Sequence, residues 1–211
     1  MDVVYDNSGS GGSGVNIRAM RGLLLPMIAL LAGHPAQQQL KLEIRTYRGT
    51  EDVSAATRVI VHRAGQRENP VGQISHGTRR TIAVSPGVYD AQAIHEKDGK
   101  VLNIRWAERF VVMPYPDEGG HHLEVVNFMN GFGALQIRWG GSHAPGSDTD
   151  VALFTPDEHS QPVAVPMTPG PYALFVVRAG QYDVLVGRGR TATWYHGIDV
   201  PLDRTRLWIV P

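Results

Sequence analysis

The sequence predicts an all-β protein made of two tandem, small antiparallel β-sandwich domains that follow an N-terminal signal segment. Three observations lead to this fold class. From Leu40 onward, apolar and polar residues alternate with the period of two that is typical of half-buried strands. Clusters of Gly, Pro, Asn and Asp separate these segments at intervals of roughly 8–12 residues, as in sandwiches. The second half of the chain also repeats the order of motifs found in the first half.

The alternating segments begin directly after a polar tract. In the first of them, Leu40, Leu42 and Ile44 share one face and charged residues occupy the other. The same pattern, or a short β-branched run, predicts strands at 58–62, 81–84, 88–94, 101–112, 122–128, 134–139, 150–154, 172–177, 182–186, 191–200 and 206–210. Because no window of three helical turns interrupts them, we expect no helix after residue 40.

Length and composition fit this organisation. The chain has 211 residues, of which 42% are hydrophobic and 19% are charged, as expected of one large or two small globular domains. Its 24 Gly and 14 Pro suit a fold with many tight turns. The absence of Cys from the sequence excludes disulfides, thiolate metal sites and cysteine nucleophiles.

Two stretches of the chain carry the same motifs in the same order. Each has Gly-x-Tyr-Asp at a predicted strand, a Trp about 12–17 residues after the Tyr, and a closing apolar strand. The repeated residues are Gly87, Tyr89 and Trp106 in the first half and Gly180, Tyr182 and Trp194 in the second. We therefore interpret the chain as a duplication, with domains at 40–128 and 133–211.

The repeated residues are expected to have structural roles. A glycine directly before a strand suits a tight turn with positive φ. Tyr89 and Tyr182 should point into the sandwich cores while each hydroxyl reaches a backbone group, as in a tyrosine corner. Trp106 and Trp194 should pack in the middle of the same cores, because large aromatic residues on repeated strands are usually buried.

The pattern Pro/Ala-Gly-x-Tyr-x-Val/Ala resembles a known kind of module. In a repeat of about 85 residues, it is similar to the carboxypeptidase-regulatory-like and PEGA-type β-sandwich modules of bacterial exported proteins. The resemblance covers both halves of the chain and implies immunoglobulin-like or transthyretin-like folds. It also implies an accessory role without catalytic residues, in which the module recognises a partner or holds another domain in place.

Residues 20–36 have the layout of a secretory signal peptide. A basic stretch precedes an apolar run of about 12 residues, and the chain then turns polar. The run is shorter than the roughly 20 residues that a membrane-spanning helix needs. We expect residues 1–19, which are rich in Gly and Ser, to be a disordered extension or linker, with Met20 as the natural start. An N-terminal helix of the mature protein is the alternative, and Pro26 disfavours it.

The charge balance and the N-terminus bear on localisation and partners. Lys and Arg number 20 together, as do Asp and Glu, so the formal net charge is +0 and no basic excess attracts nucleic acid. His34 occupies the position where a lipoprotein box needs Cys, so we expect no lipid anchor. The chain is therefore predicted to be periplasmic or secreted, in contact with a membrane only if its signal segment remains uncleaved.

Motifs for metal binding or catalysis are weak. His121 and His122 are adjacent, and adjacent residues on a strand point to opposite faces. Asp148, Asp150 and the acidic pair 157–158 lack the glycine and distal glutamate of a calcium loop. Gly-x-Ser-x-Gly does not occur outside the N-terminal linker tract. We therefore expect no metal, no cofactor and no enzyme, although a carboxylate pair for glycoside cleavage depends on space and stays open.

The second half of the chain offers a candidate binding surface. Trp194 and Tyr195 are adjacent, so one of them must face outward from a regular strand. An exposed Tyr195 beside His196 and Arg190 could stack on a sugar or on a partner protein. The alternative is that these residues cover the seam between the two domains.

These features favour an exported, non-catalytic protein that acts as a protein-binding or assembly accessory module in the cell envelope. The export signal, the duplication and the weakness of catalytic motifs all point to that class. A carbohydrate- or peptidoglycan-binding module that uses the aromatic residues of the second half is the alternative, and an envelope hydrolase is the third hypothesis. The expected partner is an envelope protein, with a glycan as the alternative.

Overall fold

The computed structural model describes residues 39–75, 80–114, 121–139, 151–166, 172–187 and 189–210. The chain divides into two units, 1–36 and 37–211, and all described residues belong to the second unit. The predicted extension 1–19 and signal segment 20–36 lie outside the described residues. Within the described ranges, no helix has the length and apolar character needed to cross a membrane.

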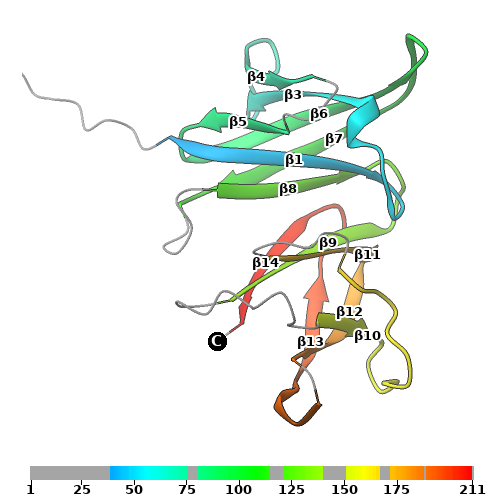
Figure 1. The fold of residues 1–211 in the computed structure, drawn as a ribbon. Coiled ribbons are helices and arrows are strands. Elements are labelled where there is room, and N and C mark those ends of the chain that lie inside the picture. Colours follow the sequence, from blue (N-terminus) through cyan, green and yellow to red (C-terminus); the bar gives the residue numbers. More distant parts are fainter. Residues whose placement is uncertain are drawn as a thin grey trace, which may run out of the picture. The chain divides into compact units, whose positions relative to one another are not determined.

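The first part of the described chain forms two sheets from eight strands. The strands are β1 (Leu40–Arg48), β2 (Glu51–Asp52), β3 (Thr57–Arg63), β4 (Pro70–Ile74), β5 (Thr81–Val84), β6 (Gly87–Lys97), β7 (Lys100–Val112) and β8 (His121–Asn127), with the 3-10 turn η1 (Ser54–Ala56) before β3. Sheet A contains β1 with its neighbours β2, β5 and β8, and sheet B has the order β4-β3-β6-β7. Figure 1 shows these sheets as two layers of a sandwich.

The second part also forms two sheets. Its strands are β9 (Phe132–Trp139), β10 (Val151–Phe154), β11 (Ala173–Arg178), β12 (Gly180–Val186), β13 (Thr193–Val200) and β14 (Thr205–Val210), with the 3-10 turn η2 (Gly189–Thr191) before β13. Sheet C has the order β11-β9-β14 and sheet D has the order β10-β12-β13. The predicted all-β sandwich fold class is confirmed (Figure 1).

The two sandwiches share one topology. In sheet A, β1 pairs antiparallel with β5 and parallel with β8, and in sheet C, β9 pairs antiparallel with β11 and parallel with β14. The order β3-β6-β7 likewise corresponds to β10-β12-β13. The ladder register shifts directly after the repeated tyrosine in both β6 and β12. The parallel pairs are a detail that strand patterning did not predict, because the pattern fixes the faces of a strand and not its direction.

Each sandwich has a hydrophobic core between its two sheets. The first core includes Leu42, Val61 and Tyr89, and the second includes Leu135 and Phe175. These residues come from alternate positions of facing strands, which is the arrangement that a period of two predicts.

The repeated tyrosines form equivalent hydrogen bonds. The Tyr89 hydroxyl donates to the Ser85 carbonyl at 2.5 Å, and the Tyr182 hydroxyl donates to the Arg178 carbonyl at 2.8 Å. Both partners lie four residues upstream, as expected for a tyrosine corner. Tyr89 is buried at 1% exposure, whereas Tyr182 is partly exposed beside its core.

The repeated glycines have the positive φ that we predicted for them. Gly87 and Gly180 are the first residues of β6 and β12, with φ of 159° and 156°. Each glycine already pairs in the ladder that follows, so it is the first residue of the strand and does not precede it.

The two repeated tryptophans do not lie in the cores, so that prediction is wrong. Trp106 lies opposite Gln92 of β6, and Trp194 lies opposite Leu185 of β12. Residues opposite each other in a ladder share a face. Gln92 and Leu185 each follow a core residue directly, so they and the tryptophans occupy the other face of the sheet.

A third apolar cluster joins the outer faces of sheets A and C. It contains side chains from β1, β8, β9 and β11 and the residue before β11, namely Tyr47, Leu123, Val125, Phe132, Ala134, Tyr172, Leu174 and Val176. The Val125 amide donates to Thr205 Oγ1 at 2.7 Å, and Arg45 Nη2 donates to the Tyr172 hydroxyl at 2.7 Å. The two sandwiches therefore bury a common apolar layer in addition to their own cores.

Candidate functional site

The aspartate of each Gly-x-Tyr-Asp motif is buried on the face of the sheet opposite the core. In the first sandwich, Asp90 follows the core residue Tyr89 and is 3% exposed. The bulge in β7 sets two residues opposite this aspartate, and the second of them, Arg109, has a φ of 54°. Its amide donates to Asp90 Oδ1 at 2.8 Å, and the Gly65 amide donates to Oδ2 at 3.1 Å.

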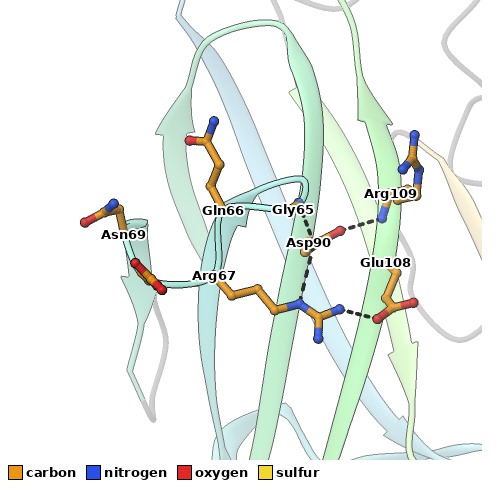
Figure 2. Close-up of a pocket in the computed structure, with 8 residues that line it drawn as sticks. Gly65, Gln66, Arg67, Asn69, Asp90, Glu108 and Arg109 are labelled. Atoms are coloured by element: carbon orange, nitrogen blue, oxygen red, sulfur yellow. Dashed lines mark hydrogen bonds and ion pairs between the residues drawn. The ribbon is translucent and has the colours of Figure 1, made fainter.

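Arg67 supplies a permanent positive charge at this site. It lies in the loop between β3 and β4, with Nε 3.8 Å from Asp90 Oδ2 and Nη2 paired with Glu108 Oε1. Its guanidinium also lies 4.1 Å from the centre of the Trp106 ring, which is a cation–π contact. Figure 2 shows Arg67 reaching between the two carboxylates.

A hollow of about 660 Å³ opens beside these residues. Its lining, shown in Figure 2, consists of Gly65, Gln66, Arg67, Glu68, Asn69, Asp90, Glu108 and Arg109. Although burial alone would raise it, the hydrogen bonds from the Arg109 and Gly65 amides hold the pKa of Asp90 below its ordinary value. Asp90 is therefore an ionised structural acceptor and is poorly suited to donate a proton as a general acid.

The second sandwich repeats this arrangement with different side chains. Asp183 follows Tyr182, is 4% exposed and accepts the Gly197 amide at 2.9 Å. Gly197 lies in the equivalent bulge of β13 and has a φ of 67°. His159 Nε2 and His196 Nδ1 lie 2.7 Å and 2.8 Å from the same oxygen, Asp183 Oδ2.

His159 takes the place that Arg67 has in the first sandwich. Its ring stacks on Trp194 with centroids 4.1 Å apart and planes inclined by 20°, as the Arg67 guanidinium lies over Trp106. His196 lies two residues after Trp194 and so occupies the position of Glu108. The second cluster has thus exchanged an arginine and a carboxylate for two imidazoles.

The second cluster could hold a metal ion. One ligand atom from each of His159, Asp183 and His196 lies within 4.8 Å of the others. The hydrogen bonds from His196 and the Gly197 amide, together with that from His159, lower the pKa of Asp183 to about 2 although burial opposes the shift. The carboxylate is therefore ionised at neutral pH, which is the form that binds a cation.

The first sandwich exposes an apolar edge strand. Strand β7 pairs with β6, and Figure 1 shows it at the margin of sheet B. Of the twelve large apolar side chains that are exposed in the described part of the chain, five lie on β7 or directly after it, namely Val101, Leu102, Ile104, Val111 and Met113. The middle of this edge meets polar partners, since Arg105 Nη2 donates to Asp203 Oδ1 at 2.8 Å and Arg204 Nη1 donates to the Glu108 carbonyl.

The predicted partner surface of Tyr195, His196 and Arg190 is divided by the fold. Tyr195 packs against the second core and meets Trp208 edge-on at 4.9 Å, so the prediction that it faces outward is wrong. His196 points to the opposite face, toward Asp183, because adjacent strand residues alternate. Arg190 is exposed on η2.

Sequence reasoning missed His159 and predicted no metal ligands. His159 follows β10 and meets Asp183 only in space, 24 residues apart. A signal was present in the repeat, because Trp-x-Glu at 106–108 and Trp-x-His at 194–196 occupy the same place. Residues two apart on a strand share a face, so Trp194 and His196 had to lie together.

No family model matches the chain, and none of the curated proteins matches it. Solved structures with some likeness include the Bacillus anthracis TIE protein (TM-score 0.31, 14% identity, 82% of this chain and 34% of that chain). A leucine-rich repeat protein from Bacteroides thetaiotaomicron has a TM-score of 0.30 and 12% identity over 82% of this chain and 26% of that chain. GBS52, the minor pilin of Streptococcus agalactiae, has a TM-score of 0.26 and 11% identity over 82% and 94%.

The chain spans about a third and about a quarter of the length of the first two of these structures. At TM-scores near 0.3, such likenesses carry no argument about function. The resemblance to carboxypeptidase-regulatory-like and PEGA-type modules stays a prediction.

Proposed function

We propose that this chain is an exported, non-catalytic binding module that holds a partner polypeptide of the cell envelope in an assembly. The partner contributes an extended segment that pairs with the edge strand β7. The signal-like segment at 20–36 supports a periplasmic or secreted location.

The observation that carries this proposal is the exposed apolar edge of β7. Val101, Leu102 and Ile104 are each exposed by half or more, at 54%, 54% and 50%. An edge strand offers unpaired backbone groups, and exposed apolar side chains beside them provide pockets for a partner's alternating residues. Monomeric proteins usually protect such an edge with charges or a covering loop. Residues 203 and 204 contact β7 at Arg105 and Glu108, so the exposed part before them, 101–104, is the part that favours a partner.

The buried acidic sites support a non-catalytic role. Asp90 is held by two backbone amides, and Asp183 accepts the Gly197 amide. A carboxylate kept ionised by such contacts stabilises the fold and is poorly suited to move protons.

The carbohydrate-binding alternative receives less support from the aromatic residues of the second half. His159 covers one face of the Trp194 ring, and Tyr195 packs on the core side. Sugar binding by stacking needs an open aromatic face.

Photo-crosslinking tests the proposal with a matched pair of positions on the same sheet. A photoreactive amino acid replaces Leu102 on β7 or Val71 on β4, two exposed residues on opposite edge strands of sheet B. The full chain is expressed in its source cells and irradiated, and adducts are identified by mass spectrometry. We expect position 102 to link to one defined segment of one envelope protein, and position 71 to give no such adduct.

Charge substitutions provide the functional control. Leu102→Lys should reduce the amount of isolated complex by at least about 10-fold, because lysine on an edge strand opposes strand addition. Val71→Lys should leave the amount of complex within about 2-fold. Equal crosslinking from both positions, or a complex that is unaffected by Leu102→Lys, would refute binding at β7.

A further inference from the structure

Among the described residues, the contacts of one buried carboxylate in the second sandwich include no permanently charged group. Asp183 is 4% exposed, and its hydrogen-bond partners within the described ranges are the Gly197 amide, His159 and His196. Histidine, unlike arginine, is not a permanent cation. Buried carboxylates are normally compensated by a cation or a metal ion.

The first sandwich shows what this position requires. There, the equivalent carboxylate of Asp90 has a permanently charged partner, since Arg67 lies 3.8 Å away and stacks on Trp106. In the second sandwich, His159 stacks on Trp194 in the same way. Both sandwiches therefore have the aspartate and the tryptophan. Where the first has the cation Arg67, the second has a histidine, which can ligate a metal ion.

We propose that His159, Asp183 and His196 form a binding site for a divalent transition-metal ion of the zinc type. The ligands are His159 Nε2, His196 Nδ1 and Asp183 Oδ2, and these three atoms already lie within 4.8 Å of one another. The site is independent of strand β7, so it does not rest on the proposed binding function.

The geometry needs only a small adjustment to accept the ion. The two nitrogens lie 2.7 Å and 2.8 Å from Asp183 Oδ2. A tetrahedral ion with bonds of about 2.0 Å separates its ligand atoms by about 3.3 Å, so each contact opens by roughly half an ångström. Each imidazole then carries its proton on its other nitrogen, Nδ1 in His159 and Nε2 in His196.

The surroundings hold the ligands in place. The Gly197 amide binds Asp183 Oδ1 at 2.9 Å and leaves Oδ2 for the ion. Stacking on Trp194 and an edge contact with Phe154 fix the His159 ring. Such outer contacts orient ligands and increase metal affinity.

The ligand set selects the class of metal. Two imidazoles and one carboxylate suit zinc and its neighbours, whereas calcium and magnesium prefer sites made of oxygen. Three protein ligands leave a fourth position open, and the His196 side chain is 63% exposed. That position therefore faces solvent and accepts water or a ligand from a partner.

Zinc titration of the metal-free chain tests the site. The full chain is dialysed against EDTA, and Zn²⁺ is then added in competition with a chromophoric chelator. We expect one ion to bind per chain. Zinc should also change the imidazole ¹⁵N shifts of His159 and His196 and raise the thermal unfolding midpoint.

Three variants distinguish the site from adventitious binding. His159→Arg rebuilds the arrangement of the first sandwich, so it should fold without metal and weaken Zn²⁺ binding at least about 100-fold, since even outer-shell changes cost 10–100-fold. His196→Gln is a second test, to be used if the arginine variant does not fold. It should weaken Zn²⁺ binding to a similar extent. Glu158→Gln changes an exposed neighbour outside the ligand set and should bind as wild type does. Failure of the chain to take up Zn²⁺, or unchanged affinity in His159→Arg or His196→Gln, would overturn the proposal.

Discussion

The two sandwiches solve the same electrostatic problem in different ways. Each buries an aspartate beside a bulge, and each covers it with a group that stacks on a tryptophan. In the first sandwich that group is Arg67, which is charged at all accessible pH values. In the second it is His159, whose neutral form is also a metal ligand. The first site therefore carries its own cation, whereas the described side-chain partners of the second are two imidazoles.

This difference shows which part of the repeated motif is structural. The aspartate and the bulge amide are common to both copies, as Asp90 with Arg109 and Asp183 with Gly197. The amide is available because a bulge residue in the left-handed region turns its N–H toward the other strand. The residues above this acceptor have diverged, so they are the ones free to take on a new role.

Removing each aspartate gives the largest effect and tests the comparison directly. Asp90→Ala leaves the Gly65 and Arg109 amides without their acceptor and leaves Arg67 without its buried partner, which should cost about 3 kcal/mol of unfolding free energy. Asp183→Ala orphans one amide and should cost about 1.5 kcal/mol in metal-free buffer, because exposed His196 can bind water. Urea unfolding followed by circular dichroism measures both.

The control for this pair is a conservative change at each position. Asn keeps one acceptor oxygen, so Asp90→Asn and Asp183→Asn should each cost less than the alanine variant. Equal losses from the two alanine variants would show that Arg67 and the second amide add nothing, and the two sites would then be energetically equivalent.

The fold could be predicted largely from the sequence because its signals are local. Alternation placed almost every long strand, and the predicted strand 81–84 has the bounds of β5. The short strands β2 and β4 were not predicted. Strand β2 has only two residues, and β4 begins with Pro70, so neither shows a clear alternation of apolar and polar residues. The parallel pairing of β8 with β1 is a property of the whole sheet and leaves no local pattern.

The candidate site was predicted poorly because it depends on register. Trp106 was expected inside, but its face is set by pairing with Gln92 across a turn and a bulge. A shift of one residue exchanges the two faces of a strand, and sequence alone does not fix that shift. Arg67 and His159 lie in loops whose approach to the aspartates exists only in the folded chain.

Acid titration probes Glu43, which lies beside the contact between Arg45 of the first sandwich and Tyr172 of the second. It tests a site that belongs to neither aspartate cluster. Burial alone would raise the pKa of Glu43, but contacts with His121 at 2.9 Å and Arg45 at 2.6 Å lower it to about 2 from an ordinary value of 4.5. The stabilisation is therefore complete above about pH 5 and is lost as the pH falls toward 2. We expect about 2 kcal/mol to be lost between pH 7 and pH 3 through this group.

Glu43→Gln should flatten this part of the stability curve in urea unfolding measured at each pH. Glu51→Gln is the matched control, since the Arg48–Glu51 pair joins the end of β1 to β2, is exposed and contributes at most about 1 kcal/mol. An acid dependence that Glu43→Gln leaves unchanged would assign the loss of stability to other carboxylates.

The repeated tyrosines give the smallest difference and show how far the two copies remain equivalent. Both hydroxyls donate to a carbonyl four residues upstream, but Tyr89 is 1% exposed and Tyr182 is partly exposed. Tyr89→Phe should cost about 1 kcal/mol, because water cannot replace the lost hydrogen bond, whereas Tyr182→Phe should cost less than about 0.5 kcal/mol. Urea unfolding resolves this difference, and hydrogen exchange should show faster local opening around Ser85 in the first variant. A larger cost for Tyr182→Phe would mean that the tyrosine hydrogen bond contributes more stability in the second sandwich than in the first. The two sandwiches would then differ at their tyrosine corners as well as at their buried aspartates.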